Sequence, residues 1–286
     1  MLKWNDKILF YIRLGGLILI TSFLVTDLIL AITHPQPQFK DLNYSERVSN
    51  YYSFFTTQTN YIVAVYFFAY LFESKFKHKK PSYLIKLAVT TYITVTMLVF
   101  WFGIITKAQD SNQYDAYHWV STVILHLIIP SSMITSYVLT SGDIIYHLKT
   151  HHKLYLWLIL LYPFLYFLII SVRGSLRYYS GRPVGTWYPY FFLNVYQHLG
   201  WLIMIFSVLL IIGLFVGLQY LYIYINNLLY IKYKGQTLNK TVNEKIFGIK
   251  ENSVSNSSPI ISFEPEIAGK DDNSFFSPPS NPENEY

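Results

Sequence analysis

The chain has 286 residues, of which 52% are hydrophobic and only 13% are charged. Soluble domains carry about 25% charged residues, so this composition indicates a membrane protein. The absence of cysteine excludes disulfides and thiolate metal sites. The net charge of +6 does not indicate nucleic-acid binding, because the basic residues lie in short segments between apolar runs.

A membrane-spanning helix needs about 20 predominantly apolar residues. Six stretches of the chain meet this requirement, at about 8–32, 51–73, 85–106, 118–140, 153–172 and 200–230. The first stretch is too long for a cleavable signal peptide and has no small-residue cleavage site. The sequence therefore predicts an all-α polytopic membrane protein with six transmembrane helices.

Basic residues are distributed unequally between the two sides of this six-helix arrangement. The side that includes both termini carries the larger set, which is Lys3, Lys7, Lys75, Lys77, Lys79, Lys80, Lys149, Lys153, Lys232 and Lys234. Cytoplasmic loops carry an excess of Lys and Arg. We therefore expect a multi-pass protein of the cell membrane with both termini in the cytoplasm.

The last part of the chain has a different composition, rich in Ser, Asn, Pro and acidic residues. Such a segment buries too little apolar surface to offset the entropy lost on ordering. We expect two parts, a six-helix transmembrane domain over 1–232 and a disordered cytoplasmic tail over 233–286.

Five consecutive polar residues, at 56–60 in the stretch FFTTQTN, open the second apolar run. In the six-helix arrangement Thr56 lies roughly 8 Å inside the membrane from the outer face, and His126 on the fourth helix lies roughly 12 Å inside. Asp27 lies near the outer end of the first helix. Two reactive side chains on different helices are thus expected at similar depth.

Each of these residues also has a structural interpretation. Threonines in membrane helices commonly bond to their own helix or join helices together. His126 is either a hydrogen-bonded structural residue or a functional one, since ionisable residues inside the membrane are rare. Pro130 has no N–H to donate to the carbonyl of residue 126, which leaves that carbonyl free. A disturbed helix beside a histidine is a candidate binding locus.

Other residues near the outer face of the membrane are candidate substrate contacts. Asp27 either sits at the membrane surface, pairs with Arg173, or orients His126. Arg173 either extends to lipid headgroups or clamps a carboxylate. Trp187, Tyr188 and Tyr190 form either an interfacial aromatic belt or one wall of a lipid site. The histidines at 147, 151 and 152 lack the carboxylate or cysteine spacing of a metal site, and no metal or cofactor is expected.

Four motifs together resemble the androgen-induced-gene family of integral membrane proteins, most closely its bacterial Pr-six-Pr branch. They are FFT at 54–56, LHLIIP at 125–130, YPFLYFLIISVRG at 162–174 and WYPYFFLN at 187–194. The resemblance covers roughly residues 8–230. Phe191 and Asn194 differ from the bacterial pattern, which has Pro and Asp there.

The resemblance implies an intramembrane hydrolase of fatty-acid esters with Thr56 as the nucleophile and His126 as the base. A neutral histidine can take the proton from a threonine hydroxyl. The side-chain amides of Gln58 and Asn60 are candidate oxyanion donors. The expected partners are membrane lipids, including a lipid ester substrate. The alternative is a non-catalytic lipid-binding or small-solute transport protein, in which the same polar cluster lines a cavity.

Overall fold

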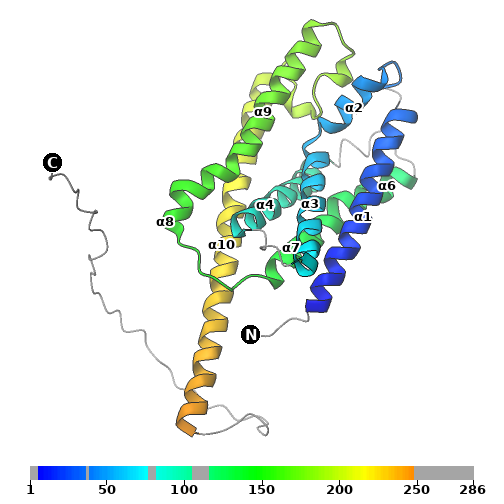
Figure 1. The fold of residues 1–286 in the computed structure, drawn as a ribbon. Helices are drawn as coiled ribbons and strands as arrows, with labels where there is room; N and C mark the ends of the chain where they lie inside the picture. The colour runs from blue at the N-terminus through cyan, green and yellow to red at the C-terminus, as the bar shows by residue number, and fades with distance from the viewer. Residues whose placement is uncertain (1–5, 37–38, 77–81, 105–115, 248–286) are drawn as a thin grey trace, which may run out of the picture. The chain divides into compact units, whose positions relative to one another are not determined.

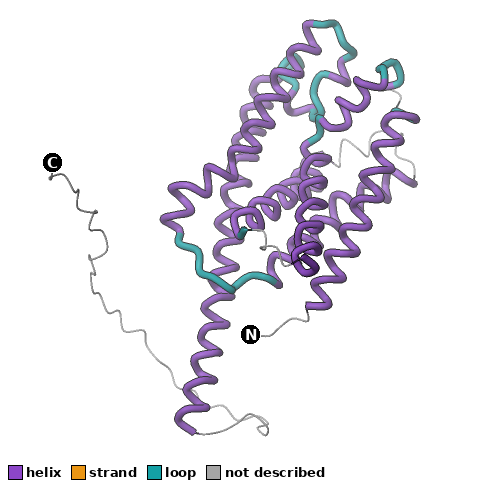
Figure 2. The backbone as a smooth tube through the Cα atoms, viewed as in Figure 1, coloured by secondary structure: helices purple, strands orange, loops and turns teal. Residues whose placement is uncertain are grey.

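The computed structural model describes residues 6–36, 39–76, 82–104 and 116–247. All regular secondary structure in these segments is helical, as Figure 2 shows. The all-α class predicted from the sequence is therefore confirmed. The chain divides into two units, Met1–Lys240 and Thr241–Tyr286. The features below belong to the first unit.

The helices follow one another without any strand between them in the described segments (Figure 1). Some α-helices continue directly into single π-helical turns. In chain order the elements are α1 (Asp6–Thr33), α2 (Tyr44–Tyr52), α3 (Phe55–Phe76), α4 (Tyr83–Val99), η2 (Phe100–Ile104), α6 (Ala116–Val123), η3 (Ile124–Ile128), α7 (Ile129–Leu139), α8 (Leu148–Thr150), η4 (His151–Tyr155), α9 (Leu156–Tyr179), η5 (Val184–Thr186), η6 (Phe191–Leu193) and α10 (Gly200–Phe247).

Within the described part of the chain, five continuous helical segments are long and apolar enough to cross a membrane. They are Lys7–Thr33, Tyr83–Ile104, Ala116–Leu139, Leu148–Tyr179 and Gly200–Gly235. The remaining predicted span, the second in chain order at 51–73, corresponds mainly to α3, which has 22 residues and a length of about 33 Å. Its polar first turns lower its mean hydropathy below that of the other five. The protein is an all-α polytopic membrane protein.

Helix α4 lies at the centre of the packing, with α3 and α7 against it, while α1 packs on α3 and α7 (Figure 1). Ile20, Phe67, Ile93 and Met133 form the apolar core of this group. The ring of Phe67 also lies directly over Gly16, where a larger side chain would collide with it. The small residue therefore allows α1 to approach α3 closely.

Several hydroxyl groups inside the bundle form hydrogen bonds with neighbouring helices. Thr94 on α4 is within 2.7 Å of the Tyr222 hydroxyl on α10, and the Tyr92 hydroxyl donates to the Ile159 carbonyl at 2.7 Å. The Tyr137 hydroxyl donates to the Tyr222 carbonyl at 2.9 Å. Polar groups without water must be paired within the protein, so these bonds position α7, α9 and α10 around α4.

Two boundaries differ from the prediction. The second predicted helix, 51–73, is interrupted: α2 ends at Tyr52 and α3 begins at Phe55. The backbone N–H and the hydroxyl of Ser53 both donate to the Asn50 carbonyl, at 3.1 and 2.6 Å, which closes α2. At the other end, residues 233–247 were expected in the tail but continue α10 to Phe247.

The remaining tail expectation, over 248–286, lies outside the described residues. Four of the basic residues that were used to predict orientation, Lys3, Lys77, Lys79 and Lys80, also lie outside them.

Candidate functional site

Thr56 lies in the first turn of α3, directly after the break that separates α3 from α2. Its backbone N–H donates to the Tyr190 hydroxyl at 3.2 Å. The first amides of a helix have no carbonyl one turn earlier, and here Tyr190 satisfies one of them. Burial raises the pKa of Tyr190 above its ordinary value, so the phenol keeps its proton. The loop after α9 is thereby attached to the start of α3.

His126 lies in the π-helical turn η3, between α6 and α7. The Ile129 N–H donates to the Ile124 carbonyl, five residues earlier, and Pro130 provides no N–H at the next position. The carbonyl of His126 instead accepts a hydrogen bond from Trp101 Nε1 at 2.8 Å. The free carbonyl that Pro130 predicts is therefore present, and a side chain of η2 satisfies it.

Asn60 connects the two helices that carry Thr56 and His126. Its Nδ2 donates to the Thr56 carbonyl at 2.8 Å and to the Leu125 carbonyl at 3.3 Å. Because carbonyls only accept, these two bonds fix which end of the amide is nitrogen. The side chain is 1% exposed. Asn60 thus holds the start of α3 against the π-helical turn η3.

The tautomer of His126 follows from its contacts. Nδ1 is 3.1 Å from the carbonyl of Thr122, and a carbonyl can only accept. A neutral imidazole carries one N–H, so Nδ1 is the protonated nitrogen and Nε2 has the free lone pair. The ring also stacks on Phe100, with 3.9 Å between the centroids. His126 is therefore oriented and is able to accept a proton at Nε2.

A polar cavity of about 280 Å³ brings four of the predicted site residues together. Thr56, Asn60, Asp27 and His126 all line it. Asp27 does not pair with Arg173; its carboxylate accepts hydrogen bonds from the Tyr117 hydroxyl at 2.6 Å and from the Ser121 hydroxyl at 3.0 and 3.2 Å. Both donors belong to α6, so Asp27 attaches α1 to α6 at the wall of this cavity.

Part of the wall of the polar cavity comes from the segment between α1 and α2, which contributes Gln36 and Phe39. Arg47, which lines the cavity, donates to the Ile32 carbonyl at 2.7 Å and to the Lys40 carbonyl at 2.6 Å. The last carbonyls of a helix lack intrahelical partners and favour a cation nearby. Arg47 thus closes the end of α1 and holds the connecting segment beside the cavity.

An apolar cavity of about 590 Å³ lies on the other side of Thr56. It is formed mainly by side chains of α4, α9 and α10, including Val95, Leu160 and Phe215. Tyr190 contributes to its wall. Among the residues that the structure describes, Thr56 alone lines both this apolar cavity and the polar cavity. The start of α3 therefore lies between a cavity with an almost wholly apolar lining and one whose lining also carries polar side chains.

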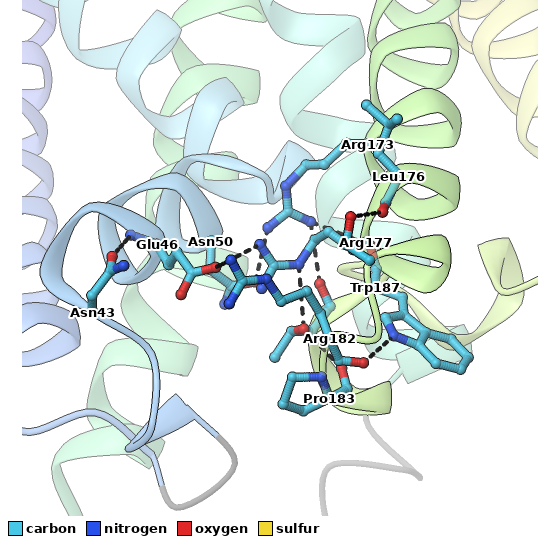
Figure 3. Close-up of polar contacts among 11 residues, drawn as sticks. Asn43, Glu46, Asn50, Arg173, Leu176, Arg177, Arg182, Pro183 and Trp187 are labelled. Atoms are coloured by element: carbon cyan, nitrogen blue, oxygen red, sulfur yellow. Dashed lines mark hydrogen bonds and ion pairs between the residues drawn. The ribbon is translucent and has the colours of Figure 1, made fainter.

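Four other predicted site residues line neither cavity. Both ends of the Gln58 amide are engaged, because Nε2 donates to the Tyr52 carbonyl and Oε1 accepts from the Tyr162 hydroxyl, both at 2.8 Å. Tyr188 packs over Gly174. Arg173 and Trp187 belong to a polar cluster at the end of α9, shown in Figure 3. There Arg173 donates to the Trp187 carbonyl at 3.3 Å.

Three residues that support the polar cavity were not predicted from the sequence. Trp101 supports the carbonyl of His126, and Tyr117 and Ser121 hold Asp27. A spacing of four residues places Tyr117 and Ser121 on one face of α6, so that signal was present. The Trp101 contact had no sequence signal, because it depends on which faces of two consecutive spans meet.

No group of three or more His, Cys, Asp or Glu side chains suited to a metal ion occurs among the described residues. A scan against protein-family models, a search of curated proteins and a search of solved structures each find no match to this chain.

Proposed function

We propose that this protein is an intramembrane hydrolase of lipid esters, with Thr56 as the nucleophile and His126 as the general base. One observation carries the proposal: Thr56 lies between an apolar cavity of about 590 Å³ and a polar cavity of about 280 Å³. An ester of a fatty acid has the same division, with an apolar acyl chain on one side of the carbonyl and an alcohol on the other.

In this proposal the acyl chain occupies the apolar cavity and the alcohol occupies the polar cavity. His126 Nε2 takes the proton of the Thr56 hydroxyl as its oxygen attacks the ester carbonyl. The same histidine then gives that proton to the departing alcohol, which leaves an acyl ester on Thr56. A water molecule, deprotonated by His126, hydrolyses this ester and releases the fatty acid.

The oxyanion donor in this proposal is a backbone amide rather than a side chain. Both N–H groups of the Asn60 amide already donate to carbonyls. The first backbone hydrogen bond of α3 runs from the Gln58 N–H to the Phe54 carbonyl, so the Thr57 N–H precedes the hydrogen-bonded part of the helix. An N–H directly after a nucleophile, at a helix start, is suited to stabilise negative charge.

The motif resemblance supports the same pair of residues, and the lysine distribution supports a cell-membrane location with both termini in the cytoplasm. The second candidate is lipid binding without turnover. It is favoured by the absence, within the described part of the chain, of a hydrogen bond between Thr56 and His126. The hydrolase requires these side chains to approach one another when substrate binds, as catalytic groups in free enzymes often do.

Labelling with a fluorophosphonate, which reacts with activated hydroxyls, separates these two functions. Membranes with the wild-type protein are compared with Thr56→Val and His126→Ala, and the adduct is located by mass spectrometry. We expect the adduct on Thr56, none in Thr56→Val, and a rate lower by about 10²–10⁴-fold in His126→Ala. Thr26→Val is the matched control, because the exposed Thr26 hydroxyl only donates to the Ser22 carbonyl.

Unlabelled wild-type protein that is folded and inserted would support lipid binding instead. Labelling retained in Thr56→Val would refute Thr56 as the nucleophile.

A further inference from the structure

The end of α9 carries a cluster of three arginines around one carboxylate (Figure 3). Glu46 of α2 is 3.7 Å from Arg177 Nη1 and 3.2 Å from Arg182 Nη2. Arg173 contacts only neutral acceptors, the carbonyls of Thr186 and Trp187 and the side chain of Asn50. Three guanidinium groups therefore face one carboxylate, and two positive charges remain without a partner charge inside the cluster.

Arg173 and Arg177 are four residues apart and share one face of α9. Both line a groove of about 530 Å³, together with Ser49 and four apolar residues of α9. These residues, Leu168, Ile169, Val172 and Leu176, are 43–65% exposed. The groove thus has two cations at one end and an exposed apolar track leading away from them.

Arg177 has unused hydrogen-bonding capacity. The Arg177 side chain is 12% exposed, and its Nη2 is buried without a hydrogen-bond partner. Its Nε donates to the Thr186 hydroxyl at 3.3 Å. A buried guanidinium nitrogen without an acceptor is costly, so an oxygen ligand at this position would be favourable.

The aromatic residues beside the cluster place it at the level of lipid headgroups. Trp187 and Tyr196 both pack on Tyr178, with ring centroids 4.9 and 3.6 Å from it. Tyrosine and tryptophan concentrate where the apolar region of a membrane meets water. A phosphate at this level would reach the arginines while its acyl chains remain in the apolar region.

We propose that this groove is a binding site for an anionic phospholipid. The headgroup phosphate accepts hydrogen bonds from Arg173 and Arg177, and one acyl chain lies along Leu168, Ile169 and Val172. Arginine forms strong, paired hydrogen bonds with phosphate. The net positive charge of the cluster favours a lipid with net negative charge over a zwitterionic one. This site is separate from both cavities that Thr56 lines.

The proposal is tested by titrating the purified full-length protein, in detergent micelles, with dioleoyl phosphatidylglycerol or dioleoyl phosphatidylcholine. Native mass spectrometry gives the bound fraction of each lipid. We expect the wild type to prefer phosphatidylglycerol by at least about fivefold, which corresponds to the interaction of one basic residue with an anionic lipid. Arg177→Gln should lose this preference. Lys40→Gln, which removes an exposed positive charge outside the groove, should keep it.

Arg173→Gln is the second variant, because it removes a cation of the groove without breaking the Glu46 ion pairs. If Arg177→Gln does not fold, loss of the preference in Arg173→Gln supports the site, and an unchanged preference overturns it. Equal binding of the two lipids by the wild type also overturns the proposal. Displacement of phosphatidylglycerol by an equal concentration of glycerol 3-phosphate would show that the acyl track contributes nothing, and would overturn it as well.

Discussion

Replacing Trp101 with Phe should destabilise the π-helical turn that carries His126. The substitution removes the Nε1–H that donates to the His126 carbonyl at 2.8 Å. Pro130 provides no replacement N–H, so the carbonyl loses its partner. An unsatisfied buried acceptor costs about 1–3 kcal/mol. Because Trp101 is only partly buried, we expect the lower part of this range, about 1–2 kcal/mol in the free energy of unfolding.

The free energy is measured by far-UV circular dichroism during unfolding in mixed detergent micelles. The control for loss of an indole is Trp201→Phe, since Trp201 is 62% exposed and has no hydrogen bond within the described residues. We expect Trp201→Phe to change stability by less than about 0.5 kcal/mol.

A double-mutant cycle tests the role assigned to Pro130. Pro130→Ala restores an N–H one turn after His126, and this N–H can donate to the carbonyl that Trp101 would otherwise satisfy. Trp101→Phe should then cost about 1 kcal/mol less in the Pro130→Ala background than in the wild type. Costs that simply add would refute the reasoning, because they would show that the two groups do not serve one carbonyl.

Two further substitutions test other parts of the packing. Asn60→Asp keeps the shape of the side chain but places oxygen where Nδ2 donates to two carbonyls. We expect the free energy of unfolding, measured in the same assay, to fall by about 2–4 kcal/mol. If Asn60→Asp lowered it by less than Asn60→Leu does, the amide orientation would be contradicted. Gly174→Ala places a methyl group against the Tyr188 ring and should lower the free energy of unfolding by about 1–3 kcal/mol. Gly213 has open space around it, so Gly213→Ala should leave the free energy of unfolding unchanged or raise it by up to about 1 kcal/mol. Equal effects at the two glycines would contradict the close packing of Tyr188.

Part of the candidate site was accessible from the sequence because depth along a helix follows from residue counting. Thr56 and His126 were expected at similar depth, and both line one polar cavity. The free carbonyl beside His126 followed from the chemistry of Pro130 alone. Asp27 was placed at the correct end of its helix, although its partners proved to be Tyr117 and Ser121 rather than Arg173.

Other features were not predictable because they depend on which face of each helix meets a neighbour. The polar run at 56–60 points in several directions, and counting placed Thr56 and Asn60 on one face of the helix without showing which neighbour that face meets. Asn60 meets η3, whereas Gln58 meets Tyr162 on α9. The break before α3 was also missed, since the apolar run continues through Tyr51 and Phe55 and only the Ser53 bonds end α2.

The all-α membrane class and the positions of most helices followed from the amino-acid sequence. Those properties follow from the apolar length a membrane requires and from the rise of a helix. Only the tertiary structure decided which polar groups meet. In helices that are apolar on nearly every side, periodicity does not select a face, so the rotation of each helix is set by its contacts. Those contacts bring Thr56, Asn60 and His126 to one cavity wall and leave Gln58 and Arg173 outside it.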